Sequence, residues 1–181
     1  YNTCNKVYNC SGSDVWQGDK NIHTNEWKLY RKAETWLKKK IKLSEFQTKT
    51  GLHIEERPGM VNFSIVGRNA NSEERAEYVK WDQKTSERKV IAKEFNGKFK
   101  DLQAVVGGET GIDIFPVGSD KGQVIKDFIG DTIYFFGDRM DEAGNDYPLG
   151  KEITQGSAIS VMGWKDTYDK LLLLRVLGIA K

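Results

Sequence analysis

The spacing of apolar and polar positions predicts a helix followed by a hairpin in the first half of the chain. From Asn25 to about Leu43, apolar side chains recur at intervals of three and four residues, which is typical of an amphipathic helix. Two strand-like runs, 52–56 and 61–66, lie on either side of Pro58-Gly59. A proline followed by a glycine is a strong turn signal, so we expect these runs to form a β-hairpin.

The middle of the chain predicts two more helices and two more strands. Asn71 and Glu74 have the spacing of a capping box, which predicts a helix from there to about residue 81. A second helix is expected at 86–99, with its apolar face formed by Val90, Ile91, Phe95 and Phe99. The remaining strands are predicted at 102–106 and 111–115. This order favours an antiparallel sheet covered by helices on one face, an α+β layer.

The two ends of the chain have different patterns. Residues 1–22 combine short extended pieces with turn residues, so a strand followed by a hairpin is expected. After Pro116 we expect a loop and short helix at 118–129, strands at 132–136 and 158–162, and a helix at 166–177. This alternation of helix and strand favours a parallel sheet.

One of these strands ends in a group of polar residues. The apolar run Thr132–Phe136 predicts a buried strand, and it stops at Gly137-Asp138, before a loop that ends in Gly144-Asn145-Asp146. In open α/β sheets, ligands bind at the carboxyl ends of strands, and carboxylates there suit Mg²⁺. The same residues would also suit a tight turn in which Asp and Asn bond their own backbone.

Composition narrows the classes of function. The chain has 181 residues, 38% of them hydrophobic, and 28 basic against 26 acidic residues give a net charge of +2 and a pI near 8.4. This balance provides no general attraction to nucleic acid or to an anionic membrane, so neither is expected as a partner. No apolar run has the length of a membrane span and no signal peptide is recognisable, so we expect a cytoplasmic protein. Cys4 and Cys10 are expected to be free thiols.

Three arginines stand near turns of the middle region. Arg57 precedes Pro58-Gly59, Arg68 follows Gly67, and Arg75 lies in the first turns of a predicted helix. Guanidinium groups match the geometry of phosphate oxygens, so three in one pocket would form a phosphate clamp. Their spacing alone favours three separate surface arginines.

Asp113 and Lys121 are two further candidates. Asp113 is an acid within an otherwise apolar strand, where it would either accept hydrogen bonds from sugar hydroxyls or lie at a sheet edge. Lys121 begins a predicted helix, and an ammonium group beside a phosphoryl group would offset charge in the transition state. A lysine in a surface loop is ordinarily just solvated, so both roles stay open.

Several short motifs occur in a fixed order along the chain. They are RPGMVNFS at 57–64, Gly67-Arg68, Glu74-Arg75, Gly107-Gly108, DIFP at 113–116, Asp120-Lys121, FFGD at 135–138 and GND at 144–146. Together they resemble the eukaryotic-type phosphomannomutases of the haloacid-dehalogenase superfamily. The resemblance implies an α/β fold, with a partial haloacid-dehalogenase-like core that contains a parallel sheet. It also implies an α+β cap domain that contains an antiparallel sheet.

The resemblance implies domain boundaries and roles in the cap. Residues 1–22 would form a residual core strand and hairpin, 23–117 the substrate-binding cap, and 118–181 the C-terminal part of the core. The residues that would hold the substrate, a hexose phosphate such as mannose phosphate, are Arg57, Arg68 and Arg75 at its phosphate and Asp113 at a sugar hydroxyl. A homodimer formed through the cap is also expected.

The resemblance implies a catalytic centre in the core. Lys121 would lie near the transferred phosphoryl group, and Asp138 would serve in catalysis as a ligand of Mg²⁺. Asp146 would be a second metal ligand, and together with Asn145 it would support the loop. The cofactor expected is therefore Mg²⁺.

Two features depart from the family pattern. Gly111 stands where the family usually has a serine that contacts phosphate, which leaves the identity of the sugar open. The superfamily nucleophile lies in an Asp-x-Asp motif, and none occurs between Tyr1 and Lys181. Since covalent phosphoryl transfer needs that nucleophile, we expect it upstream of residue 1 and expect this chain alone to be inactive.

Three functions therefore follow from the sequence. The first is Mg²⁺-dependent phosphoryl transfer on a hexose phosphate through an aspartyl-phosphate, as part of a phosphomannomutase-like isomerase. The second is a sugar-phosphate phosphatase of the same superfamily, in which water receives the phosphoryl group. The third is a non-catalytic protein, structural or sugar-phosphate-binding, that keeps the arginine pocket.

Overall fold

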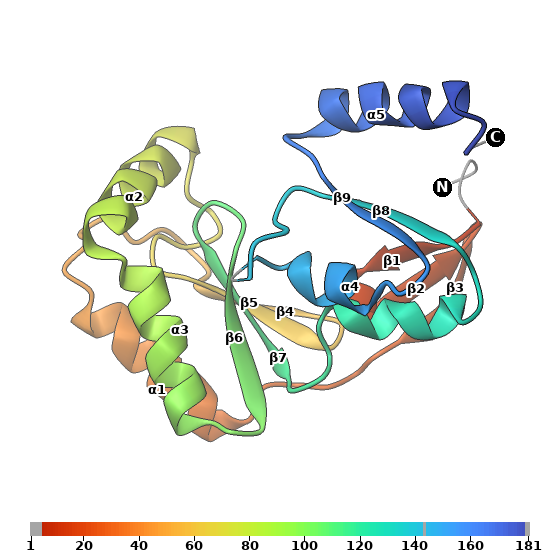
Figure 1. The fold of residues 1–181 in the computed structure, drawn as a ribbon. Helices are drawn as coiled ribbons and strands as arrows, with labels where there is room; N and C mark the ends of the chain where they lie inside the picture. The colour runs from red at the N-terminus through yellow and green to blue at the C-terminus, as the bar shows by residue number, and fades with distance from the viewer. Residues whose placement is uncertain (1–4, 143, 180–181) are drawn as a thin grey trace.

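A four-stranded antiparallel sheet with helices on one face dominates the first two thirds of the chain in the computed structural model, which describes residues 5–142 and 144–179 (Figure 1). Its strands, in spatial order, are β4 (Ile54–Arg57), β5 (Met60–Ser64), β7 (Gly111–Pro116) and β6 (Leu102–Gly107). The helices are α1 (Arg31–Leu43), α2 (Ser72–Thr85) and α3 (Glu87–Lys98). This arrangement confirms the predicted α+β layer.

The two faces of this sheet differ because side chains alternate along each strand. Val61, Phe63, Ile112 and Ile114 on the two central strands are no more than 1% exposed. They share one core cluster with apolar residues of all three helices, which include Leu37, Tyr78, Ile91 and Phe95. The opposite face carries the polar residues described below.

The first helix begins later than its apolar pattern suggests. It was predicted from Asn25, but α1 begins at Arg31, after an extended residue at Tyr30. The reason is local: the Asn25 carboxamide oxygen accepts the backbone N–H of Trp27 at 2.9 Å, and this turn competes with helix. Trp27 and Leu29 still pack against the core cluster, whereas Tyr30, another apolar residue of the pattern, is 37% exposed. The predicted helical conformation of residues 25–30 was wrong.

The second helix has the predicted start. The Asn71 side chain accepts the backbone N–H of Glu74 at 2.9 Å, and the Glu74 carboxylate accepts that of Asn71 at 2.8 Å. This capping box is confirmed, although α2 continues to Thr85 rather than ending near residue 81. On α3, the prediction that Val90 is buried was wrong, because its side chain is 48% exposed on the outer side of the helix.

Replacing Asn71 with alanine should lower the stability of this region. The substitution removes the acceptor for a helix N–H, and losses of this kind cost about 1 kcal/mol. The free energy of unfolding from urea denaturation measures it. Glu73→Ala, in the same helical turn but outside the capping box, is the control, and an equal loss in both variants would contradict the capping role.

The chain opens with an antiparallel meander of β1 (Val7–Asn9), β2 (Asp14–Gln17) and β3 (Lys20–Thr24). A strand and hairpin were predicted here, and β3 continues to Thr24, past the boundary predicted between residues 22 and 23. The proposed domain boundaries stay a prediction. Cys10 is a free thiol, whereas Cys4 lies outside the described residues.

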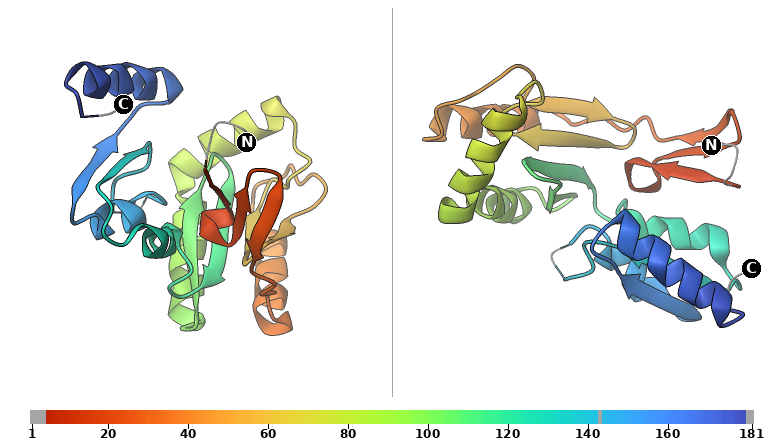
Figure 2. Two further views of the ribbon diagram at one scale, coloured as in Figure 1. Left: turned by 90° about the vertical axis from the view of Figure 1, so that its right-hand side faces the viewer. Right: turned by 90° about the horizontal axis from the view of Figure 1, so that it is seen from above.

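The last third forms a smaller α/β body beside the meander (Figure 2). A 3₁₀ segment, Lys121–Phe128, leads to β8 (Ile133–Gly137), followed by α4 (Tyr147–Glu152), β9 (Gly156–Ser160) and α5 (Trp164–Val176). The predicted parallel pairing is confirmed, since Phe135 of β8 pairs with Ala158 of β9. Within the described residues, no helix has both the length and the apolar character needed to cross a membrane.

The strand β8 is less buried than predicted. Tyr134 is 38% exposed, and of the residues of β8 only Gly137 is fully buried. Parallel sheets are normally covered on both faces, but the sheet described here has only two strands. The prediction of a buried strand was therefore wrong for these residues.

Candidate functional site

A row of polar side chains crosses the helix-free face of the four-stranded sheet. Glu55 on β4 is paired with Asn62 on β5, and Asn62 is paired with Asp113 on β7. Residues directly opposite each other in antiparallel strands project from the same face. The Asn62 amide donates to Asp113 Oδ1 at 2.7 Å, which holds both side chains in place.

The turn after β5 fixes Arg68. Gly67 has a φ of +89°, and a Cβ there would lie 2.0 Å from the carbonyl oxygen of Thr50, so only glycine fits. The flanking backbone is tied to the preceding loop: Thr50 N–H donates to Val66 O at 2.8 Å, and Arg68 N–H donates to Leu52 O at 2.6 Å. Arg68 therefore leaves the sheet from a rigid turn.

Arg75 is anchored by main-chain carbonyl groups. Its Nε donates to Ala70 O at 3.0 Å and its Nη2 donates to Arg68 O at 3.1 Å. The first turns of α2 thus bring Arg75 against the turn that carries Arg68. The capping box fixes the first turn of α2, from which Arg75 extends.

Arg57 is held by a carboxylate on its own strand. Its Nε donates to Glu55 Oε2 at 2.9 Å, and its Nη2 donates to the same oxygen. Arg68 Nε lies 3.0 Å from that oxygen as an ion pair, but its N–H does not point along the line required for a hydrogen bond. Arg68 Nε is therefore a buried donor without a hydrogen-bond partner.

The four predicted substrate residues line one cavity of about 290 Å³. They are Arg57, Arg68, Arg75 and Asp113. Asn62 also lines this cavity, and its Oδ1 is buried without a hydrogen-bond partner. Since buried polar groups are normally paired, an unpaired donor and an unpaired acceptor fit a polar ligand that has both acceptor and donor atoms. We refer to Arg57, Arg68 and Arg75 as the clamp.

Glu55 and Asn62 were not predicted from the sequence as site residues. A signal for both was present: Glu55 lies two residues before Arg57, and β4 extends one residue beyond the predicted run to include Arg57, so the two side chains share a face. Asn62 interrupts the apolar run of β5 in the same way that Asp113 interrupts that of β7.

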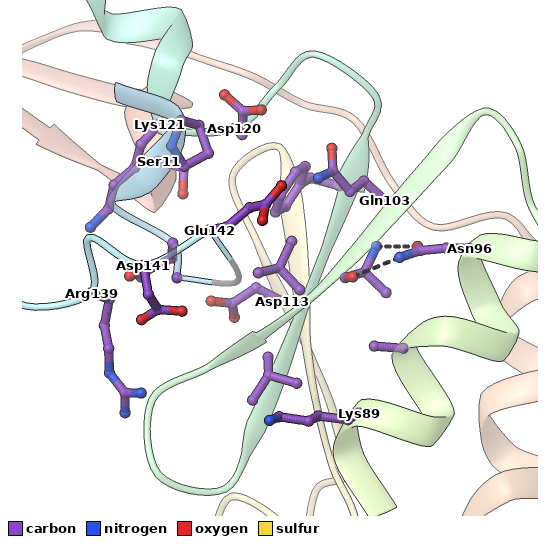
Figure 3. Close-up of a pocket in the computed structure, with 18 of the residues that line it drawn as sticks. Ser11, Lys89, Asn96, Gln103, Asp113, Asp120, Lys121, Arg139, Asp141 and Glu142 are labelled. Atoms are coloured by element: carbon purple, nitrogen blue, oxygen red, sulfur yellow. Dashed lines mark hydrogen bonds between the residues drawn. The ribbon is translucent and has the colours of Figure 1, made fainter. Parts of the chain in front are cut away.

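A second, larger cavity of about 650 Å³ lies between the sheet and the loops of the smaller body. Asp113 lines both cavities, and Figure 3 shows it directed from β7 into the space beside Asp141 and Glu142. Lys121 lines the same space at the start of the 3₁₀ segment, where Asp120 Oδ1 caps Gly122 N–H at 2.8 Å. The structure therefore brings Asp113 and Lys121 to one cavity that adjoins the clamp.

Lys121 forms an ion pair with buried Asp146. Its ammonium group donates to Asp146 Oδ1, and Asp146 Oδ2 accepts the backbone N–H of Arg139 at 3.0 Å. Burial alone would raise the pKa of Asp146, but the hydrogen bonds from Lys121 and Arg139 stabilise its charged form more strongly. The pKa of Asp146 therefore lies below its usual value.

The predicted magnesium ligands do not form a complete set. Asp138 is exposed at the end of β8, whereas both oxygens of Asp146 are engaged. Among residues 5–142 and 144–179, no three His, Cys, Asp or Glu side chains are grouped to hold a metal ion. Asn145 Oδ1, next to Asp146, is a buried acceptor without a hydrogen-bond partner. Asp138 and Asn145 fit part of an oxygen-ligand site, since Mg²⁺ takes one or two carboxylates and completes its shell with water and phosphate.

Comparison with known proteins connects this geometry to a family. The profile of the eukaryotic phosphomannomutase family matches residues 17–175. Similar curated proteins include the phosphomannomutase of Schizosaccharomyces pombe, 42% identical over 110 residues, which cover 58% of this chain and 43% of that protein. The phosphomannomutase of Encephalitozoon cuniculi is 33% identical over 150 residues, or 79% of this chain and 57% of that protein. The chain thus spans about half the length of these relatives.

Solved structures give a weaker likeness. The sucrose-phosphatase of Synechocystis sp. PCC6803, solved with sucrose and phosphate, is 13% identical, with a TM-score of 0.47 over 92% of this chain and 63% of that chain. Such a score carries no assignment by itself. The family profile covers most of the sequence, including the clamp, Lys121 and the loop that follows β8. The chain belongs to the eukaryotic phosphomannomutase family.

Proposed function

We propose that this chain binds a hexose phosphate, such as mannose phosphate, with the phosphate in the clamp and a sugar hydroxyl at Asp113. The observation that carries the proposal is the cavity in which Arg57, Arg68 and Arg75 converge beside Asp113. Guanidinium forks pair with phosphate oxygens through charge-assisted hydrogen bonds, which are among the strongest in proteins. The unpaired Arg68 Nε supports the same assignment.

We propose further that the chain is one part of a Mg²⁺-dependent enzyme that transfers a phosphoryl group through an aspartyl-phosphate. Lys121, held by Asp146, would place positive charge near the transferred group, where it stabilises the transition state. Asp138 would contribute a carboxylate to Mg²⁺, which offsets phosphate charge when bound. Asp146 as a second ligand and a homodimer formed through the cap both stay predictions.

The nucleophile is the part that these residues do not supply. The sequence contains no Asp-x-Asp motif, and covalent transfer needs such a carboxylate. We therefore propose that the chain binds the sugar phosphate without turning it over, and that a segment outside these 181 residues completes the active site.

An assay of the 181-residue chain with mannose 1-phosphate and Mg²⁺ tests this proposal. Calorimetry should show binding, while the assay should detect neither mannose 6-phosphate nor inorganic phosphate above a blank without protein. Steady formation of either product would show that the chain carries its own nucleophile. Absence of binding would reject the clamp.

A phosphatase is the second candidate, and Gly111 favours it. A Cβ at this position would lie 2.6 Å from Asn62 Nδ2, so the cavity has no room for a side chain there unless Asn62 moves. A side-chain contact to phosphate from this position is therefore lost, which weakens the case for a mutase that must hold phosphate at either end of the sugar. With a completed active site, release of inorganic phosphate alone would identify a phosphatase, and conversion of the 1-phosphate to the 6-phosphate a mutase. A completed site that binds sugar phosphate without either reaction would leave a non-catalytic role.

A further inference from the structure

Glu55 is the only acidic residue in direct contact with the clamp among the ion pairs of the described residues. One of its oxygens, Oε2, accepts two N–H groups of Arg57 and lies 3.0 Å from Arg68 Nε. Its side chain is 33% exposed, and those of Arg57 and Arg68 are each 31% exposed. Glu55 thus joins two of the three arginines while they still face the cavity.

Glu55 leaves terminal N–H groups of both guanidinium groups unengaged. It accepts the Nε–H and one terminal N–H of Arg57, and it faces Arg68 Nε at 3.0 Å as an ion pair without a hydrogen bond. A guanidinium group has five N–H donors in a fixed fork, so the remaining terminal donors can still point into the cavity. This geometry orients the forks and leaves their ends open to a ligand.

The charges around the cavity also favour an orienting role for Glu55. Three guanidinium groups around a cavity of about 290 Å³ repel one another when no anion is bound. Arg75 is fixed by main-chain carbonyl groups, whereas Arg57 and Arg68 share only the Glu55 carboxylate as a charged partner. One internal carboxylate lets the two side chains converge before the ligand arrives, which reduces the ordering cost of binding.

We propose that Glu55 is a positioning residue of the clamp, which holds Arg57 and Arg68 ready for the phosphate of the ligand. This inference rests on the proposed function, because it concerns the same sugar-phosphate site. It makes a counter-intuitive prediction: removing a negative charge from beside an anion site weakens anion binding there.

The experiment compares Glu55→Gln with Glu56→Gln by calorimetric titration of mannose 1-phosphate. Glu56 is the matched control, since it lies on the same strand but projects away from the cavity and pairs with exposed Lys28 at 3.2 Å. General electrostatics predicts slightly tighter binding in both variants. We expect Glu55→Gln to weaken binding about tenfold, through loss of an ordered charge-assisted pair, and Glu56→Gln to change it by less than about twofold.

A double-mutant cycle with Arg57→Ala separates positioning from a general structural effect. In the Arg57→Ala background, Glu55→Gln should weaken binding much less than it does in the wild-type chain, because the main group that Glu55 orients is absent. Glu55→Asp, which keeps the charge but is one methylene shorter, should also weaken binding and serves if the glutamine variant does not fold. Circular dichroism confirms folding in each case.

Each outcome separates the two proposals. Unchanged or tighter binding in Glu55→Gln, or additive losses in the cycle, would overturn the role of Glu55 and leave the proposed function intact. Failure of the wild-type chain to bind mannose 1-phosphate would overturn both.

Discussion

Arg68→Ala should weaken the binding of mannose 1-phosphate by about 10- to 100-fold, the largest effect that we expect from any one clamp residue. Hydrogen bonds to charged groups contribute about 1.5–3 kcal/mol each, and Arg68 alone in the clamp has a buried N–H without a hydrogen-bond partner. Arg57 already donates two N–H groups to Glu55 and Arg75 donates to main-chain carbonyl groups, whereas Arg68 meets Glu55 only as an ion pair. Arg68 therefore has the most donor capacity left for a ligand.

Arg31→Ala is the control for this substitution. Arg31 is exposed at the start of α1 and does not line the clamp cavity, yet the change in net charge is the same. Calorimetric titrations at one salt concentration compare the two variants with the wild-type chain. Equal affinities in both variants would mean that the ligand responds to overall charge and that the clamp does not exist.

Lys121→Met should destabilise the smaller body by about 3 kcal/mol. Asp146, whose side chain is 4% exposed, would lose its cation and remain a buried charge. Removing one partner of a buried ion pair typically costs about 3–5 kcal/mol, and the lower end applies because the Lys121 side chain is 32% exposed. Urea denaturation measures the loss as a free energy of unfolding.

Two further variants test the cause of that loss. Lys126→Met, at an exposed position of the same 3₁₀ segment, should change the free energy of unfolding little. Adding Asp146→Asn to Lys121→Met removes the buried charge and should recover part of the stability. A stability of Lys121→Met equal to that of the wild-type chain would show that Asp146 does not depend on this lysine.

Most of the four-stranded sheet and its helices could be predicted from the sequence. Alternation in β5 and β7 identified Val61, Phe63, Ile112 and Ile114 as strand positions, and these are the residues buried against the helices. The capping box at Asn71 was readable because it depends on two side chains three residues apart. Such local signals survive in the folded protein when packing agrees with them.

Other features depended on contacts that periodicity does not report. The Asn25 turn delayed α1 because a single side-chain hydrogen bond replaced a turn of helix. The apolar residues of β8 predict a buried strand, but the burial of a strand depends on the elements that pack on it, which its own sequence does not specify. Glu55 was overlooked for a related reason: its spacing to Arg57 places both side chains on one face, but the convergence of Arg68 on the same carboxylate depends on the fold.

The candidate site was only partly predictable. Arg57, Arg68, Arg75 and Asp113 were selected from their types and positions, and their convergence required the register of β4, β5 and β7 together with the Gly67 turn. The pairing of Lys121 with Asp146 joins residues 25 positions apart. No spacing rule predicts a contact of that kind.

The central claim is that the three clamp arginines bind the phosphate of a sugar phosphate. Titration of mannose 1-phosphate into isotope-labelled protein, followed through the arginine side-chain N–H resonances by nuclear magnetic resonance, tests it most directly. We expect large, saturable shifts at Arg57, Arg68 and Arg75, while Arg31 and Arg175, which lie outside the clamp cavity, stay unchanged. Shifts at other arginines only, or no saturable shift at any of the three, would contradict it.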